Sequence, residues 1–86
     1  MKLILPEPLI QYANHQSQLA LDVTDLAALK TGLQQTYPEL ADVLFENDQL
    51  NGFVALFLDD QPVNLSSNVV LHNHSQLRVI CAISGG

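Results

Sequence analysis

The sequence predicts a small α+β domain in which one main helix packs on a mixed sheet of four to five strands. Three observations predict this class. Apolar segments typical of strands lie near both ends of the chain, an amphipathic segment follows residue 24, and apolar runs separated by polar turns occupy the second half. With 86 residues, of which 48% are hydrophobic and 14% charged, the composition suits one globular core. We therefore expect a single domain over residues 1–86.

The first part of the chain predicts two strands separated by a loop. Lys2–Leu5 is a short apolar run that Pro6-Glu7-Pro8 ends. Leu9–Ser17 is predicted as a loop with about one turn of helix near its start. Gln18–Val23 alternates apolar and polar residues, which indicates a half-buried strand whose inner face carries Leu19, Leu21 and Val23.

The main helix is predicted to begin at Thr24, whose side chain can act as the N-cap, with the charge of Asp25 at the positive end of the helix dipole. One apolar stripe follows at helical spacing and comprises Leu26, Leu29, Leu33 and Tyr37. Pro38 cannot continue this helix but suits the first turn of another. We therefore expect a second, short helix over Pro38–Phe45.

The second half of the chain predicts three further strands. Glu46–Gly52 is a polar loop, and Phe53–Leu58 is a strand that is apolar at every position. Asp59–Pro62 is predicted as a turn, followed by a short return strand at Val63–Leu65. The last strand is predicted over Gln76–Ile83. Because it and the first strand are short and strongly apolar, we expect the two to be adjacent, parallel and central, covered by the helix stripe.

Two of these strands are apolar on both faces, although one helix covers only one face of a sheet. In the last strand, Ile80 and Ala82 lie opposite Leu77, Val79 and Cys81. We therefore expect the second face to meet another protein, through Phe53, Ala55, Phe57, Ile80, Ala82 and Ile83. The alternative is that this face packs under the loops at residues 46–52 and 66–74.

The sequence closes on Ser84-Gly85-Gly86. Glycine has no Cβ, so such a segment can enter a slot too narrow for other residues and present a carboxylate to an enzyme. The alternative is an ordinary frayed terminus. Because nothing after Ile83 can bury apolar surface, we expect residues 84–86 to be a flexible tail in the free protein.

The charge balance narrows the classes of partner. Nine acidic residues against three basic ones give a net charge of −6. Nucleic acids and anionic membranes both require a basic surface, so neither is expected as a partner, and docking to a basic protein surface is favoured. One cysteine cannot form an internal disulfide, and no signal peptide or long apolar span is apparent. We expect a cytoplasmic protein.

The remaining reactive residue types are assigned to structure. His72 and His74 have a spacing that metals can use, but a zinc site needs further ligands, and His15 and Cys81 have no reason to converge on them. We expect a solvated loop and no metal. Strand alternation places Cys81 with Leu77 and Val79, which predicts an inert buried thiol rather than a nucleophile.

The chain resembles the ubiquitin-like sulfur carriers of the MoaD/ThiS family, small β-grasp proteins that end in Gly-Gly. The resemblance spans nearly the whole chain, and its length is similar to that of the molybdopterin synthase small subunit. The segments that carry it are Leu5-Pro6-Glu7-Pro8-Leu9, Tyr37-Pro38 with Leu40, Leu44-Phe45, Phe53-Val54 and Val79-Ile80-Cys81-Ala82-Ile83-Ser84-Gly85-Gly86.

The resemblance implies a carrier rather than an enzyme. An ATP-dependent, MoeB/ThiF-like adenylating enzyme would activate the carboxylate of Gly86, and sulfur would then convert it to a thiocarboxylate. Gly85 and Ser84 would be recognised as the tail. The carrier itself would bind no cofactor, because the ATP site belongs to the partner. The implied pathway is the synthesis of molybdopterin, in which the sulfur-acceptor enzyme would be the large subunit of molybdopterin synthase.

Other functions stay open at this point. The sulfur could instead serve amino-acid, thiamine or other metabolite synthesis, the chain could be a ubiquitin-like modifier of lysines, or it could be a plain interaction domain. It also departs from the family pattern. Asn73-His74-Ser75 stands where Asp-Gly-Asp is frequent, and Asn14-His15 where Gly-Gly is frequent. Ala55 replaces an asparagine and Cys81 a proline. A tight turn before the last strand is expected at Asn73, because Asn tolerates left-handed backbone.

Overall fold

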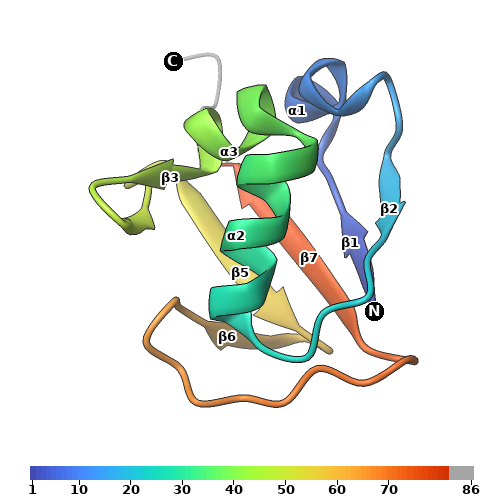
Figure 1. Ribbon diagram of the computed structural model, residues 1–86, viewed down its shortest axis with the longest axis vertical. Coiled ribbons are helices and arrows are strands. Elements are labelled where there is room, and N and C mark those ends of the chain that lie inside the picture. Colours follow the sequence, from blue (N-terminus) through green and yellow to red (C-terminus); the bar gives the residue numbers. More distant parts are fainter. Residues whose placement is uncertain (82–86) are drawn as a thin grey trace.

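A five-stranded mixed sheet with helices on one of its faces forms the part of the chain that the computed structural model describes, residues 1–81 (Figure 1). The strands follow the order β2-β1-β7-β5-β6 across the sheet. Their bounds are Lys2–Ile4 for β1, Gln18–Ala20 for β2, Val54–Leu58 for β5, Gln61–Val63 for β6 and Gln76–Cys81 for β7. The helices are α1 at Glu7–Ile10, α2 at Leu26–Thr36 and α3 at Pro38–Leu44, with a 3-10 turn at Gln11–Ala13.

The first and last strands lie side by side at the centre of the sheet. β1 and β7 pair in parallel, with Leu3 opposite Leu77, and both side chains are fully buried. The other pairs, β1 with β2, β7 with β5 and β5 with β6, are antiparallel. The predicted central parallel pair is therefore confirmed over the described part of β7.

The helix stripe is also confirmed, but the N-cap is one residue later than predicted. Leu26, Leu29 and Leu33 are buried, and Tyr37 packs against the same core while partly exposed. The Oδ1 atom of Asp25 accepts a hydrogen bond from the Ala28 backbone N–H at 2.7 Å. Asp25 rather than Thr24 is thus the N-cap, because its carboxylate both accepts this bond and faces the positive end of the helix.

The segment predicted as a polar loop after α3 contains a short hairpin. Phe45 is already extended, so α3 ends at Leu44, and β3 (Phe45–Glu46) pairs with β4 (Gln49–Leu50). The hairpin turns at Asn47 and Asp48, which have φ values of 54° and 65°. Such a left-handed pair suits the right-handed twist of a hairpin, and Asn and Asp tolerate it better than most residues. The Asp48 carboxylate pairs with Lys30 of α2.

The turn between β5 and β6 is shorter than predicted. Asp59 and Asp60 form it alone, with φ values of 47° and 72°, so β6 begins at Gln61 rather than Val63. Pro62 is accommodated because β6 is an edge strand of the sheet. Asp59 also binds the start of β7: its N–H donates to the Gln76 carbonyl, and its Oδ1 accepts from the Gln76 N–H.

Two departures from the family pattern have different structural outcomes. Asn14 and His15 both have positive φ, 55° and 62°, so they adopt the left-handed backbone that glycine would take without strain. The tight turn expected at Asn73 is present, at Asn73 and His74, but neither residue has positive φ, so the turn does not use the left-handed backbone. There Ser75 closes the turn instead, since its N–H donates to the His72 carbonyl and its Oγ accepts from the His72 N–H.

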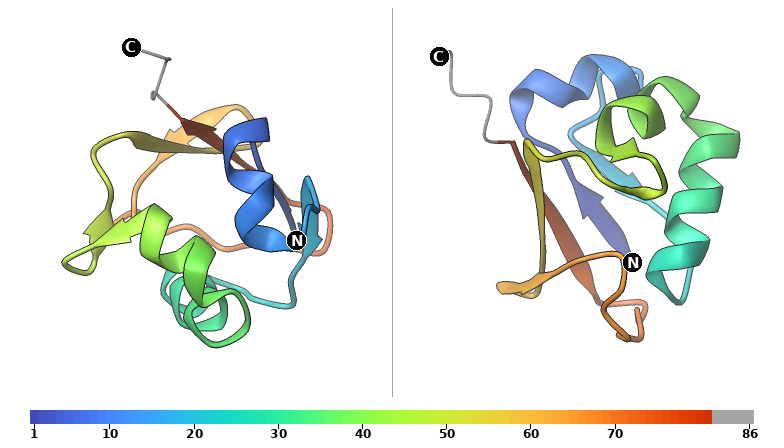
Figure 2. Two further views of the ribbon diagram at one scale, coloured as in Figure 1. Left: turned by 90° about the horizontal axis from the view of Figure 1, so that it is seen from above. Right: turned by 90° about the vertical axis from the view of Figure 1, so that its left-hand side faces the viewer.

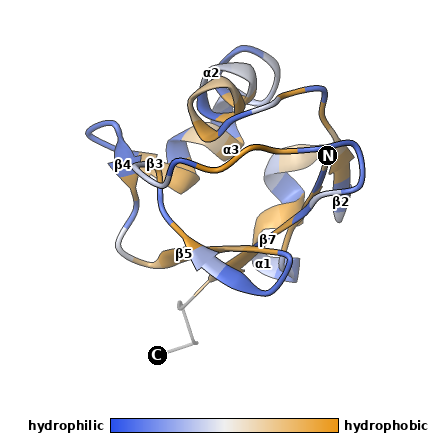
Figure 3. Ribbon diagram, turned by 90° about the horizontal axis from the view of Figure 1, so that it is seen from below, coloured by the Kyte–Doolittle hydropathy of each residue, from blue (hydrophilic) through white to orange (hydrophobic). Residues whose placement is uncertain are grey.

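The core lies between the sheet and the helices and is built mainly from leucine. Its most deeply buried large side chains are Leu3, Leu9, Leu26, Leu29, Leu33, Leu40, Leu44, Leu77 and Val79. The long segment between β6 and β7 contributes Leu71, whose N–H donates to the Thr24 carbonyl next to α2. Polar residues mark the hairpin tip and the β5–β6 turn, away from this core (Figure 3).

Candidate partner-binding face

The sheet has one face under the helices and one face that no described helix covers (Figure 2, right). Burial alternates strictly along β7: Leu77 and Val79 are buried, while Gln76, Arg78 and Ile80 are exposed. This alternation follows from the pleat, since successive side chains point to opposite faces. We call the uncovered side the outer face.

An apolar group lies on the outer face at the end where β7 leads towards the C-terminus. Ala55 pairs directly with Ile80, and Phe57 is two residues further along β5. Ile80 is 42% exposed, and Phe53, immediately before β5, is 60% exposed. These four residues, Phe53, Ala55, Phe57 and Ile80, are termed the outer patch. Exposed apolar side chains such as Phe53 and Ile80, next to the small Ala55 and the half-buried Phe57, are typical of surfaces that bind another protein.

The loops that could have covered the outer face lie on the helix side. The β3–β4 hairpin is held to α2 by the Asp48–Lys30 pair and to the end of α3 by the Asn51 N–H, which donates to the Leu44 carbonyl. The segment before β7 is held to the entry of α2 through Leu71. Neither segment buries Ile80 or Ala55, both of which are exposed.

The outer face differs in charge from the rest of the protein. Lys2 and Arg78 both lie on it, because Lys2 is paired in register with Gln76 and Arg78 with Phe57. The third basic residue, Lys30, binds Asp48 on the helix side. Exposed acidic residues on α3 and β3 include Glu39, Asp42 and Glu46. The basic partner surface expected from the net charge thus suits the helix side, whereas the strands of the outer face carry apolar residues and two cations.

The far end of the outer face holds a small polar hollow. It has a volume of about 190 Å³ and is lined by Phe57, Asp59, Asp60, Gln76 and Arg78. The face therefore changes along the strands, from apolar at the end of β7 to charged at the β5–β6 turn. Sequence reasoning missed Lys2 and Arg78 as members of this face. The alternation that selected Ile80 would also have selected Arg78, two residues earlier on the same strand.

No protein-family model matches the sequence, and no curated protein matches it. Solved structures do match its shape. A chain of the Amycolatopsis orientalis BexX/CysO complex superposes with a TM-score of 0.85 at 13% identity, over 99% of this chain and 98% of that one. CysO of Mycobacterium tuberculosis superposes with a TM-score of 0.79 at 17% identity, over 95% of this chain and 98% of that one. SAMP1 of Haloferax volcanii superposes with a TM-score of 0.77 at 21% identity, over 100% of this chain and 98% of that one.

The fold is a β-grasp. The α+β class, the mixed sheet and the main helix predicted from the sequence are confirmed with it. At identities of 13% to 21%, the similarity concerns the arrangement of the backbone. In this fold α2 packs on one face of the sheet, and the outer patch lies on the other face.

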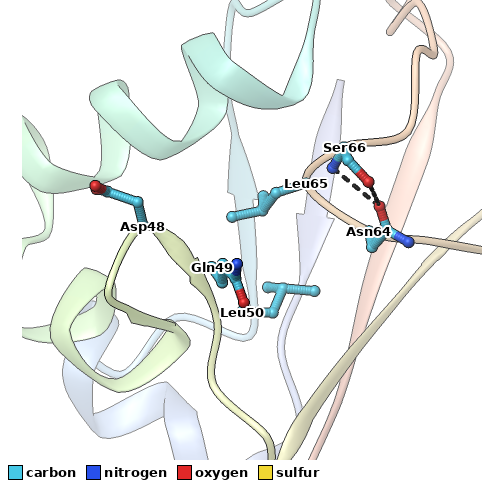
Figure 4. A pocket seen from close by; sticks show the side chains of 6 residues that line it. All are labelled: Asp48, Gln49, Leu50, Asn64, Leu65 and Ser66. Atoms are coloured by element: carbon cyan, nitrogen blue, oxygen red, sulfur yellow. Dashed lines mark hydrogen bonds between the residues drawn. The ribbon is translucent and has the colours of Figure 1, made fainter.

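A larger cavity of about 560 Å³ opens between the β3–β4 hairpin and the segment after β6 (Figure 4). It is lined by Asp48, Gln49, Leu50, Asn64, Leu65 and Ser66. The side-chain oxygen of Asn64 accepts hydrogen bonds from the backbone N–H and the hydroxyl of Ser66. The hydrogen bond and charge of Lys30 lower the pKa of Asp48. No cysteine or histidine of the described residues lines this cavity, so we assign it no reaction.

The thiol and the imidazoles differ in part from expectation. Cys81 follows the inward positions Leu77 and Val79, as predicted, but at the end of β7 it is half-buried rather than buried. His15, His72 and His74 are all exposed. Over residues 1–81, no three His, Cys, Asp or Glu side chains are grouped so that they could hold a metal ion. Among the same residues, no helix has the length and apolar character to cross a membrane.

The tail residues lie outside the described part of the chain. Gly86, Gly85 and Ser84, together with the predicted contact residues Ala82 and Ile83, therefore remain predictions from the sequence, as does the mobility expected from Ser84 onward. The described geometry shows that β7 runs beside the outer patch as far as Cys81, which pairs with Val54.

Proposed function

We propose that this β-grasp protein is a sulfur carrier that presents Gly86 as its C-terminal residue. The observation that carries the proposal is the outer patch beside the strand that leads to Ser84-Gly85-Gly86. A partner that docks on Ile80 and Phe53 is positioned to receive the chain that follows Cys81. The resemblance to MoaD/ThiS carriers and the similarity to CysO and SAMP1 in fold support the same class.

The chemistry begins from an unreactive group. A terminal carboxyl has a pKa of about 3.3–3.7, so at neutral pH it is ionised and a poor electrophile. In the proposed reaction a carboxylate oxygen of Gly86 attacks the α-phosphorus of ATP on an adenylating enzyme, and pyrophosphate leaves. Sulfide, or a persulfide whose S–S bond a thiol then cleaves, attacks the acyl carbon and displaces AMP. The product is a thiocarboxylate on Gly86.

The carrier contributes a docking face and a reactive end to this sequence. Complete burial of a Phe or Ile side chain contributes about 1.5–3 kcal/mol, and Phe53 and Ile80 retain 60% and 42% of their exposure for a partner. Arg78 borders the apolar part, and Lys2 lies farther along the same face, level with Gln76, which favours a partner with an apolar contact surface and acidic groups to one side of it. The BexX/CysO neighbour is itself a two-protein complex, which supports pairing of this fold with a partner protein.

The two proposed partners use the face in turn. A MoeB/ThiF-like adenylating enzyme loads the sulfur, and a sulfur-acceptor enzyme unloads it. We propose the large subunit of molybdopterin synthase as the acceptor, because the chain length is similar to that of the small subunit. The segments Leu5–Leu9 and Tyr37–Leu40 also resemble carriers that feed sulfur to amino-acid synthesis, which makes such an enzyme the second candidate.

The test is reconstitution with the adenylating enzyme of the same organism, ATP and a sulfide donor. Mass spectrometry should show one oxygen of the chain exchanged for sulfur. A residue appended after Gly86 should abolish the exchange, because the activated carbon must be terminal, and Gly85→Val should abolish it by widening the tail. If the unaltered chain is neither adenylated nor thiolated under these conditions, the proposal is wrong. Recovery of the chain linked to lysines of other proteins would support the modifier function instead.

A further inference from the structure

The turn that leads into β5 is built on an Asn-Gly pair. The side-chain oxygen of Asn51 accepts a hydrogen bond from the Phe53 N–H at 3.0 Å, and its backbone carbonyl accepts one from the Val54 N–H at 2.9 Å. Asn51 therefore fixes the first turn of the strand that carries the outer patch.

Gly52 is open to reaction in this turn. It is exposed, and a Cβ added to it would meet no atom within 4 Å. Within residues 1–81, its N–H donates no hydrogen bond, so its nitrogen is not held by an acceptor. The hydrogen bond from the Phe53 backbone N–H polarises the side-chain amide of Asn51, which makes its Cγ atom more electrophilic. The same bond holds Cγ towards the backbone that follows Asn51. The nitrogen of Gly52 is the nearest nucleophile along the chain.

Asn64 offers an internal comparison within the same chain. Its side-chain oxygen accepts from the Ser66 N–H at 2.9 Å, the same contact two residues ahead that Asn51 makes with Phe53. The residue after Asn64 is Leu65, whose side chain is half-buried against the core and lines the larger cavity (Figure 4). A branched, anchored neighbour hinders attack by its own nitrogen, whereas an exposed glycine does not.

We propose that Asn51 is a site of spontaneous deamidation through Gly52. The Gly52 nitrogen loses its proton to solvent and attacks Cγ of Asn51, a C–N bond forms, and the side-chain nitrogen leaves as ammonia. Water then adds to either carbonyl of the resulting succinimide and opens the ring. The products carry an aspartate or an isoaspartate at position 51, and each gains one negative charge.

The two products differ in what they do to the sheet. Aspartate retains an oxygen that can accept from the Phe53 N–H, so the turn is preserved. Isoaspartate inserts an extra methylene into the backbone, which displaces the acceptors of Phe53 and Val54 and loosens the start of β5. An effect on partner docking rests additionally on the proposed function, because Phe53 belongs to the outer patch. The modification itself does not depend on that function.

The experiment is ageing of the purified full chain in mildly alkaline buffer, followed by peptide mapping with mass spectrometry. The peptide that contains Asn51 should gain about one dalton and separate into two forms, while the peptide that contains Asn64 stays unchanged. Gly52→Ala is the matched variant, because alanine fits the open space and ordinary φ of this position, and it should slow the conversion by about tenfold.

Amide hydrogen exchange provides the structural readout. The isoaspartate fraction should lose protection at Phe53 and Val54, and Asn51→Asp should keep it. If Asn51 remains intact over a period in which a short peptide of the same sequence has converted, the proposal is wrong. It is equally wrong if Asn64 converts as fast as Asn51, or if a folded Gly52→Ala chain converts at the original rate.

Discussion

Leu77 and Val79 of β7 point under the helices and are almost completely buried, whereas Arg78 and Ile80 of the same strand point to the outer face and are exposed. Neighbouring residues thus have different roles. The inner set, Leu77 and Val79, stabilises the fold, and the outer set, Arg78 and Ile80, is available to a partner. Because the two sets alternate on one strand, substitutions one or three residues apart can separate stability from binding.

The largest expected effect is on the inner set. Leu77→Ala should lower the free energy of unfolding by about 2–5 kcal/mol, since it leaves a cavity beside Leu3 at the centre of the sheet. Ile80→Ala should change it by less than about 1 kcal/mol, because Ile80 is already 42% exposed. Urea denaturation of the two variants measures both values. Equal losses would show that the outer face is as important to stability as the inner one.

The next effect concerns binding by the outer set. Ile80→Asp places a charge in the proposed contact and should reduce the rate of adenylation by the partner enzyme at least about tenfold, or about 1.4 kcal/mol. Gln34→Asp is the matched control, because Gln34 is exposed on α2, which lies on the other face of the sheet from the outer patch. Both variants should unfold at similar urea concentrations. Similar adenylation by both would place the contact elsewhere.

A smaller effect tests the helix that covers the inner face. Asp25→Ala removes the N-cap bond to Ala28 and should cost about 1 kcal/mol of stability. Asp25→Asn should retain most of it, while Thr24→Ala should have little effect. Adenylation should be unchanged in all three, because α2 lies on the far side of the sheet from the outer patch. Thermal unfolding is a sufficient measurement, and a larger loss for Thr24→Ala would reverse the cap assignment.

The smallest effect is that of pH on the hairpin. Lys30 holds the pKa of Asp48 below its usual value of 3.8, so the ionised carboxylate favours the folded state. The stabilisation is complete above the unfolded pKa and is lost as pH falls through the lower, folded pKa. An NMR titration of the Asp48 side chain should give a midpoint below 3.8, and Lys30→Gln should raise it. A midpoint that Lys30→Gln leaves unmoved would mean that the pair does not persist in solution.

The central strands and the helix stripe could be predicted because burial imposes a period on the sequence. Lys2–Leu5, the alternation in Gln76–Ile83 and the leucines of α2 all carry that period. The β3–β4 hairpin was missed because its strands have two residues each and its turn uses Asn47-Asp48 without glycine. The early start of β6 was missed because Pro62 argues against a strand unless the strand is known to lie at an edge.

The candidate site was predictable as a face but not as a charge distribution. Apolar residues on both sides of two strands indicated a second contact surface, and Ala55 and Ile80 are indeed exposed on one side. The placement of Lys2 and Arg78 depends on the register of β1 against β7, which joins residues far apart in the chain. Net charge is a property of the whole chain, so it could not reveal that these two cations share a face.

The pairing of β1 with β7 also bears on how the chain folds. Leu3 cannot reach its partner Leu77 until nearly all of the chain is available, and closing so long a loop is entropically costly. β2 can pair with β1, and α2 can form its turns, before that point. We expect the rate-limiting step to be the insertion of β7 between β1 and β5, as in other sheets built from distant segments. During synthesis, a chain lacking residues 76–81 would leave the buried edges of β1 and β5 unpaired.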